Sequence, residues 1–289
     1  MATPQIWVKA HCRNERSSGS DIARLELTEL LRHAKLFRQS FLIEKCNTNQ
    51  SILHCECGTE LRVVRYHCRQ SICSDCQRVK AFRVSKEVEE SLNLMRENAP
   101  GLRVLFLTLT TPSCDAQDLK RELNDLPKKF AKLIRRPELK AYLIGCVRVV
   151  EISFNQEAET FHPHLHVILV VRASYIGRGY ISQARFLTLW QEVTKRADIT
   201  QVRIKPVKPN QKKATTLAAE VAAVVRYMLK PIVPAKWTPE SLSTLCKATH
   251  KRRQYEFLGD FKIARKMLPK YEPPCICASC ARSQSSGIS

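Results

Sequence analysis

The sequence has 289 residues, of which 44% are hydrophobic and 26% are charged. This composition allows one large domain or two smaller ones, each with a hydrophobic core, and it argues against global disorder. The 48 Lys and Arg residues outnumber the 27 Asp and Glu residues and give a formal net charge of +21. A charge of this size predicts a polyanionic partner, with nucleic acid ahead of an anionic membrane surface.

Three absences narrow the class of protein further. The longest uninterrupted apolar stretch in the middle of the chain, Val167 to Val171, is far too short to span a bilayer. Residues 1–16 have no apolar core of signal-peptide length, so we expect an intracellular, cytoplasmic protein without a membrane partner. No G-x-x-x-x-G-K-[ST] motif occurs, which argues against an ATP-driven motor of the P-loop type.

Taken in chain order, the residue patterns predict four segments. Residues 1–50 form a flexible and helical N-terminal segment, and residues 51–98 contain a zinc-ribbon-like cysteine cluster and a long helix. Residues 99–265 form the main domain, and residues 266–289 form a cysteine-containing C-terminal segment with a flexible tail.

Periodicity within these segments predicts helices and strands that follow one another along the chain. Helices are expected over 21–46, 74–98, 115–135, 183–195 and 217–230. Strands are expected over 61–66, 103–110, 145–154, 162–171 and 201–207, whereas 252–270 shows a mixed, basic pattern. The NQEAET turn joins two of these strands in an antiparallel hairpin. We therefore expect an α+β fold, with a central antiparallel β-sheet flanked by helices and a small Cys-rich zinc-binding module.

Three histidines alternate along one predicted strand, in His162-Pro-His164-Leu-His166. Residues i and i+2 of a strand point to the same face, so His164 and His166 present two imidazoles within reach of one cation. Glu151 lies in the preceding strand of the same hairpin and is the candidate third ligand. A carboxylate with two imidazoles suits a divalent ion such as Mg²⁺ or Mn²⁺ that keeps open positions for substrate and polarises a phosphoryl oxygen.

A predicted helix places Glu220, Tyr227 and Lys230 near one face, by the i, i+3 and i+7 spacing. Tyrosine is a known covalent nucleophile and can attack a phosphodiester. Its unperturbed pKa is about 10, so a nearby metal or cation is needed to favour the phenolate. Lys230, one turn after Tyr227, can supply that charge or steady the phosphate.

The upstream cysteines have the spacing of a zinc site. Cys55-Glu-Cys57 and Cys73-Ser-Asp-Cys76 form two knuckles joined by a β-like segment, as in a zinc ribbon with four thiolates in tetrahedral geometry. Cys68, His54 and His67 are competing ligands, so the sequence leaves the ligand set open.

Three more thiols lie near the C-terminus, in Cys275-Ile-Cys277-Ala-Ser-Cys280. Together with the upstream cysteines they are enough for two four-cysteine zinc sites, in which one upstream cysteine completes the downstream set. The remaining cysteines are predicted to be packing residues: Cys12, Cys46, Cys114, Cys146 and Cys246.

Much of the positive charge lies in three runs, at 128–136, 205–213 and 247–270. With a net charge of +21, we expect these runs to bind phosphates, and we expect DNA binding to weaken steeply as salt rises. No residue in them is identified as a reader of base sequence.

The order of the motifs resembles the rolling-circle plasmid replication initiators of the HUH endonuclease superfamily. The resemblance lies in Phe106-Leu-Thr-Leu-Thr110, then His162-Pro-His164-Leu-His166, then Tyr227-Met-Leu-Lys230. The segment from Cys68 to Cys76 is similar to a cysteine motif ahead of the nuclease in one plasmid branch, and Lys251 to Lys262 is similar to its basic C-terminal motif. The resemblance covers about Cys55 to Lys262.

This resemblance implies a nuclease domain with the metal on the face of an antiparallel sheet. It implies that Tyr227 attacks one strand of origin DNA and leaves a 5′-phosphotyrosyl link and a 3′-hydroxyl that primes synthesis. By this resemblance, His164 and His166 correspond to metal ligands of the family, and Glu151 corresponds to the third ligand. The resemblance places His162 beside the metal site. The partners are single-stranded origin DNA and a host helicase, because the chain has no helicase motor motif.

One position departs from the family pattern. In the branch concerned, a Glu lies one helical turn before the tyrosine and activates the water that ends replication. This chain has Ala223 there, and Glu220 lies a further turn back on a similar face. Either Glu220 takes this role or termination works differently.

Two other functions are compatible with parts of the sequence. The histidines satisfy the H-φ-H-φ-H-φ-φ pattern of histidine-triad nucleotide hydrolases if Pro163 counts as apolar, with His164 as the nucleophile and no metal. That alternative leaves Tyr227, the cysteines and the charge without a role. The non-enzymatic alternative is a zinc-dependent nucleic-acid-binding protein with structural histidines.

Overall fold

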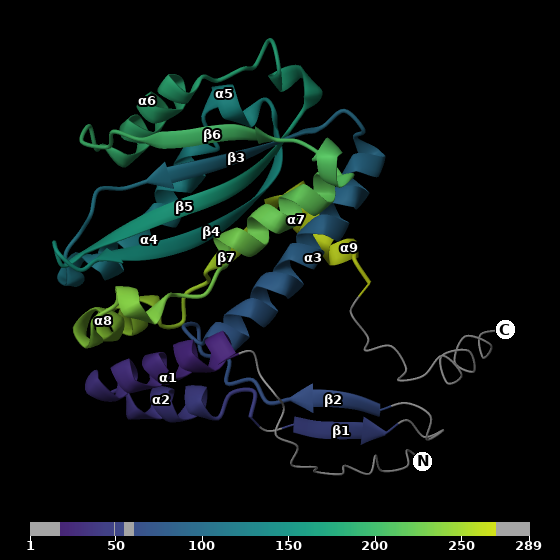
Figure 1. The fold of residues 1–289 in the computed structure, drawn as a ribbon. Helices are drawn as coiled ribbons and strands as arrows, with labels where there is room; N and C mark the ends of the chain where they lie inside the picture. The colour runs from purple at the N-terminus through teal and green to yellow at the C-terminus, as the bar shows by residue number, and fades with distance from the viewer. Residues whose placement is uncertain (1–17, 49, 55–60, 270–289) are drawn as a thin grey trace, which may run out of the picture. The chain divides into compact units, whose positions relative to one another are not determined.

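The computed structural model describes residues 18–48, 50–54 and 61–269 (Figure 1). The chain divides into two compact units, of which one spans Gln77–Leu268 and the other includes the described residues up to Cys76. Helix α3 (Ser74–Asn98) begins in the first unit and continues into the second. None of the helices in the described ranges is both long and apolar enough to cross a membrane.

The N-terminal unit begins with two helices where the sequence predicts one over 21–46. Helix α1 (Ser18–His33) and helix α2 (Phe37–Glu44) are separated by a turn in which Lys35 has a φ of 58°. An L-residue in this left-handed region cannot continue a right-handed helix, and apolar spacing alone does not reveal it. The hydroxyl of Ser40 donates to the backbone oxygen of Thr28 at 2.9 Å and ties the two helices together.

The same unit contains a two-stranded antiparallel sheet. Strand β1 (Gln50–His54) pairs with strand β2 (Leu61–Arg65), with Ile52 opposite Val63. The sequence predicts β2 but not β1, whose five residues give too short a pattern. The predicted zinc ligands Cys55 and Cys57 lie outside the described residues.

The second unit is built on a five-stranded, fully antiparallel sheet in the order β6-β3-β5-β4-β7. The strands are β3 (Arg103–Thr110), β4 (Leu143–Asn155), β5 (Thr160–Val171), β6 (Val202–Val207) and β7 (Tyr255–Gly259). Helices flank this sheet, so the predicted α+β class with a central antiparallel sheet is confirmed.

The helices of this unit lie on both faces of the sheet (Figure 1). Helix α3 packs with α7 (Leu217–Met228) and α9 (Asp260–Met267) on one face, whereas α4 (Ala116–Leu133) and α6 (Gln183–Thr194) cover the other. The remaining helical segments are α5 (Pro137–Lys140), α8 (Pro239–Thr249) and the 3₁₀ turns Ala173–Tyr175, Gln211–Lys213 and Pro234–Lys236.

Strand β5 shows which side chains share a face. Ile168 packs in the core of α3 and α7, whereas Val167 and Leu169 pack in the core of α4 and α6. Because both faces are covered there, the strand is apolar at every position from 167 to 171. His164 and His166 continue the face of Ile168, so their imidazoles lie on the same side of the sheet as α7.

The pairing of β4 with β7 depends on a glycine. At Gly145, a Cβ atom would lie 2.9 Å from the Leu258 carbonyl oxygen and 2.9 Å from the Phe261 amide nitrogen. We expect Gly145→Ala to lower the free energy of unfolding by about 1–3 kcal/mol, because the backbone where β7 passes into α9 would have to move. Urea denaturation measures this loss. Gly101→Ala is the matched control, since its methyl would meet only the Ala173 side chain at 3.2 Å. Equal midpoints for the two variants would contradict the prediction.

Candidate active site

Strand β5 presents three histidine rings in a row. The ring centroids of His162 and His164 are 4.3 Å apart, and those of His164 and His166 are 6.1 Å apart, with interplanar angles of 1° and 11°. His166 is buried, whereas the other two are half-buried. The predicted alternation along the strand therefore places the imidazoles side by side on one face.

Glu151 meets this row from strand β4, where its backbone is paired with His164. Its Oε2 lies 2.6 Å from Nε2 of His166, and its Oε1 lies 3.1 Å from Nζ of Lys230. One carboxylate therefore links His166 to Lys230, which lies two residues after the end of α7.

The surroundings fix the protonation states of two of these groups. Burial raises the pKa of Glu151, but hydrogen bonds from His166 and Lys230 outweigh it and hold this pKa at about 2. Burial lowers the pKa of His164 to about 4, with help from the charges of His162 and His166. At neutral pH, Glu151 is thus ionised and His164 is neutral, which are the forms that ligate metals.

The donor set fits a divalent cation. His164 and His166 offer imidazole nitrogens, Glu151 offers a carboxylate, and Nδ1 of His164 is buried without a hydrogen-bond partner among the described residues. Their possible ligand atoms do not all lie within 4.8 Å of one another, so binding one ion requires these side chains to move closer together. This mixture of nitrogen and oxygen donors suits Mn²⁺ or Mg²⁺.

Thr108 is a member of this cluster to which the sequence assigned no role. Its Oγ1 lies 3.2 Å from Nδ1 of His166, so the ring of His166 is held between Thr108 on β3 and Glu151 on β4. A partner on the second ring nitrogen fixes the orientation of an imidazole ligand. The alternation of threonines in Phe106-Leu-Thr-Leu-Thr110 is the signal that could have identified Thr108.

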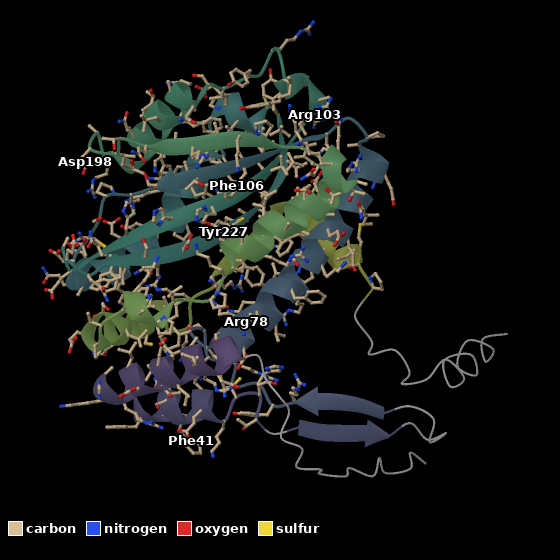
Figure 2. The ribbon with its side chains drawn as sticks, in the orientation of Figure 1. Phe41, Arg78, Arg103, Phe106, Asp198 and Tyr227 are labelled. Carbon is tan, nitrogen blue, oxygen red and sulfur yellow. The ribbon has the colours of Figure 1, made fainter. Side chains whose placement is uncertain are left out.

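Tyr227 lies at the end of α7 (Figure 2). Its side chain is 61% exposed, while Val225 and Met228 of the same helix are buried against the sheet. Nζ of Lys230 lies 4.6 Å from the centroid of the Tyr227 ring, and the same ammonium bonds Glu151. The structure thus brings the predicted nucleophile and its cation together with the predicted metal ligands.

Glu220 is not part of this arrangement in the contacts that the structure shows. Its carboxylate accepts a short hydrogen bond from the hydroxyl of Thr215, and it lines an open pocket of about 630 Å³ with residues 208–212. Ala223, at the position where the family pattern has a Glu, is exposed on the same helix as Tyr227.

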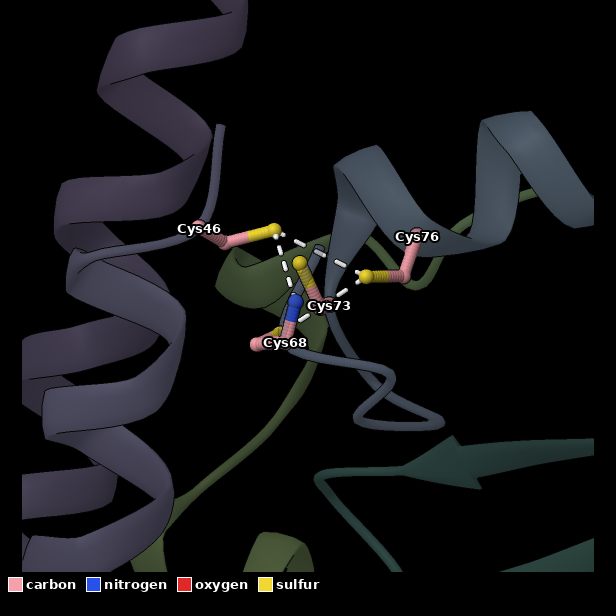
Figure 3. Close-up of side chains that lie close together, drawn as sticks. All are labelled: Cys46, Cys68, Cys73 and Cys76. Atoms are coloured by element: carbon pink, nitrogen blue, oxygen red, sulfur yellow. Dashed lines mark hydrogen bonds between the residues drawn. The ribbon is translucent and has the colours of Figure 1, made fainter. Parts of the chain in front are cut away.

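The N-terminal unit brings together four thiols: Cys46, Cys68, Cys73 and Cys76 (Figure 3). Their Sγ atoms all lie within 4.8 Å of one another, with 3.6 Å between Cys46 and Cys76 and 3.7 Å between Cys68 and Cys76. Four sulfurs at about 2.3 Å from a tetrahedral zinc are separated by about 3.8 Å. The spacing therefore fits a structural Zn²⁺.

The thiols also influence the ionisation of one another. Hydrogen bonds from Cys68 and Cys73 lower the pKa of Cys46 to about 6, and hydrogen bonds from the other three thiols lower that of Cys76. The amide of Arg69 donates to Sγ of Cys76 at 3.2 Å. Thiolates are the form of cysteine that binds metal, so the cluster favours the ligand state at two of its positions.

The cluster corrects one assignment from the sequence. The sequence predicts that Cys46 is a packing residue, but its sulfur lies among the thiols of Cys68, Cys73 and Cys76. No short Cys-x-x-Cys spacing links Cys46 to them, so no local pattern identifies it as a ligand. The predicted ligands Cys55, Cys57, Cys275, Cys277 and Cys280 lie outside the described residues.

Comparison with known proteins gives consistent matches. A family model described as "Replication protein" matches residues 61–279. A relative named "Protein rep" from Streptococcus pneumoniae serotype 2 (strain D39 / NCTC 7466) is 29% identical over 264 residues, which are 86% of this chain and 78% of the relative. A "Protein rep" from Staphylococcus aureus is 32% identical over 181 residues, 61% of this chain and 77% of the relative. No solved structure matches the chain.

Proposed function

Since the chain belongs to the replication protein family, we propose that it starts rolling-circle replication of a plasmid by nicking, and later rejoining, one strand of origin DNA. The family match confirms the predicted membership in a family of replication proteins. The nicking chemistry is supported by one observation above the others: Lys230 contacts both Glu151 and Tyr227 and so joins the candidate nucleophile to the histidines.

In this reaction the phenolic oxygen of Tyr227 attacks a phosphorus of the DNA backbone. A bond forms between that oxygen and phosphorus, and the bond from phosphorus to the 3′ oxygen breaks. The phenol loses its proton to solvent, and the departing 3′ oxygen takes one up. The products are a 5′-phosphotyrosyl link to the protein and a free 3′-hydroxyl that primes synthesis. Attack by a 3′-hydroxyl on the same link reverses these steps and rejoins the strand.

Lys230 supports the attack through its charge. Burial lowers the pKa of Lys230, but the hydrogen bond to Glu151, the negative charge of that carboxylate and the contact with Tyr227 together raise it above its usual value, so the ammonium stays protonated at neutral pH. Its Nζ lies 4.6 Å from the centroid of the Tyr227 ring, so the positive charge is beside the proposed nucleophile. The same charge can contact the phosphate that accumulates negative charge during the attack.

His164, His166 and Glu151 would hold the catalytic Mg²⁺ or Mn²⁺. When bound there, the cation polarises a phosphoryl oxygen of the DNA. Thr108 holds Nδ1 of His166 and so orients Nε2, which would exchange its contact with Glu151 for the cation. In the other unit, the cluster of Cys46, Cys68, Cys73 and Cys76 would hold a structural Zn²⁺.

The partners follow from the charge and from the proposed chemistry. A net charge of +21 favours a nucleic-acid partner, and single-stranded origin DNA is the substrate proposed here. Because the sequence contains no P-loop motif, unwinding of the duplex is assigned to a host helicase.

A nicking and joining assay tests this function. The full chain is incubated with Mn²⁺ and single-stranded oligonucleotides that tile the DNA flanking its coding sequence. We expect cleavage at one position, with a free 3′-hydroxyl on one product and the protein bound to the 5′ end of the other. Tyr227→Phe should abolish cleavage, because no other group takes over the covalent role. Retained phosphoryl transfer in Tyr227→Phe would favour the histidine-triad hydrolase, and no cleavage by either protein would favour the non-enzymatic alternative.

A further inference from the structure

The face of the sheet that bears the histidines extends to the edge strand β6. Thr108 of β3 is paired with Arg203 of β6, and Phe106 is paired with Lys205. Directly paired residues point to the same face, and the side chain of Thr108 contacts His166 on that face. Arg203 and Lys205 therefore lie on the face of the proposed nicking site.

Phe106 connects this edge to the histidine row. Its ring centroid lies 5.7 Å from that of His166, with the ring planes within 21° of each other. Nζ of Lys205 lies 5.7 Å from the same centroid. Phe106, labelled in Figure 2, is half-buried and packs against the core that includes residues of α3 and α7. An aromatic ring between an imidazole and an ammonium is thus partly open to solvent on this face.

Among the residues that the structure describes, the two cations of β6 have no acidic partner, unlike several basic groups of this unit. Arg148 pairs with Glu256, Arg196 with Asp198, and Lys230 with Glu151. Within the described part of the chain, Arg203 and Lys205 have no carboxylate within ion-pair distance, and both are exposed. Unpaired cations on an exposed strand leave a local positive charge that a phosphate can neutralise.

We propose that Phe106, Arg203 and Lys205 form a binding track for the single DNA strand beside the scissile phosphate. Phe106 stacks on one base, and the two cations of β6 bind phosphates next to it. Stacking on aromatic rings combined with backbone contacts by cations is the general mode by which proteins hold single strands without reading their sequence. The track rests on the proposed function, because it positions the strand for attack by Tyr227.

The test measures the binding of single-stranded DNA by protein variants that cannot cleave it. All variants are made in the Tyr227→Phe background, and the affinity for a fluorescein-labelled oligothymidylate is measured by anisotropy over a series of salt concentrations. Arg203→Ala/Lys205→Ala should reduce the slope of log K against log salt by about 1.4, because each phosphate contact on a single strand contributes about 0.7. Lys120→Ala/Arg178→Ala is the control: it removes the same charge from exposed positions outside the track and should leave the slope unchanged.

Phe106→Leu should weaken binding about tenfold without changing the salt slope, since stacking is lost and the phosphate contacts remain. The same variant should lose the quenching of 2-aminopurine placed in the bound strand. Circular dichroism checks that Phe106→Leu is folded, and the double variant tests the track through exposed residues alone. Binding equal to that of the control in both variants would overturn the proposal.

The outcome separates this proposal from the proposed function. If the wild-type protein forms an adduct with DNA but the track variants bind normally, the track is wrong and the nicking function stands. If the track variants lose binding but the wild-type protein forms no adduct, the single-strand site stands and the tyrosine chemistry is wrong.

Discussion

Replacement of His166 by Ala is expected to lower the rate of Mn²⁺-dependent nicking by about 1000-fold, because a lost metal contact removes several kcal/mol of transition-state stabilisation. In the structure Thr108 holds Nδ1 of His166, so that Nε2 points at Glu151, the other proposed ligand. Glu151→Gln should have a similar effect, since it removes the carboxylate that both His166 and Lys230 contact. The rate is measured with a labelled single strand at saturating Mn²⁺.

His162→Ala is the matched control in the same strand. His162 lies at the far end of the histidine row, and Ser113 is its hydrogen-bond partner, with Oγ 3.4 Å from Nδ1. We expect this variant to lose less than about tenfold in nicking rate, because the proposed metal ligands stay in place. A loss at His162 equal to that at His166 would contradict the assignment of the ligands.

Replacement of Cys46 by Ser is expected to remove zinc from the N-terminal unit and to unfold it. Structural zinc sites contribute folding free energy directly, and the free energy of binding is on the order of 10 kcal/mol in small zinc domains. Replacing one of the four thiolates by a hydroxyl removes much of this free energy of zinc binding. The loss of zinc is measured as the zinc content per chain by elemental mass spectrometry. Unfolding of the N-terminal unit is measured by limited proteolysis.

Cys246→Ser provides the comparison for Cys46→Ser. Cys246 lies in α8 of the second unit and is absent from the four-thiol cluster. Burial raises the pKa of its thiol to about 11, so it is a protonated packing group at neutral pH. We expect this variant to keep the full zinc content. Unchanged zinc in Cys46→Ser would contradict the assignment of the cluster as a zinc site.

The position of Cys46 in the four-thiol cluster also changes which cysteines are left to form a second zinc site. With Cys46 in the first set, Cys55 and Cys57 become available to join Cys275, Cys277 and Cys280, all of which lie outside the described residues. We propose that these thiols bind another zinc, so that the chain holds two. A ratio of one zinc or none per chain would contradict this second site.

The central sheet could be predicted because its strands have strong local signals. Strand β5 is apolar without interruption from 167 to 171, and its hairpin with β4 follows from the polar turn between them. Strand β7 and helix α8 were not predicted. Five residues of β7 give little pattern, and its place in the sheet depends on contacts distant in sequence, such as Nε of Arg148 donating to Glu256 at 2.9 Å.

The candidate site could be predicted where its residues lie on one strand or are separated by one helical turn. Alternation placed His164 and His166 together, and one helical turn placed Lys230 beside Tyr227. Glu220 shows the limit of this reasoning. Two helical turns separate it from Tyr227 by about 10 Å along the axis, so a shared face does not bring them into contact. Its carboxylate instead accepts a hydrogen bond from Thr215 and lines the pocket with residues 208–212.

The covalent link between protein and DNA is the most direct test of the central claim. The wild-type protein is reacted with single-stranded DNA and Mn²⁺, the adduct is digested with trypsin and nuclease, and the modified peptide is sequenced by mass spectrometry. We predict a phosphonucleotide on Tyr227, in the tryptic peptide that runs from Tyr227 to Lys236, because trypsin does not cleave between Lys230 and Pro231. An adduct on a histidine or on another tyrosine would contradict the assignment of Tyr227 as the nucleophile.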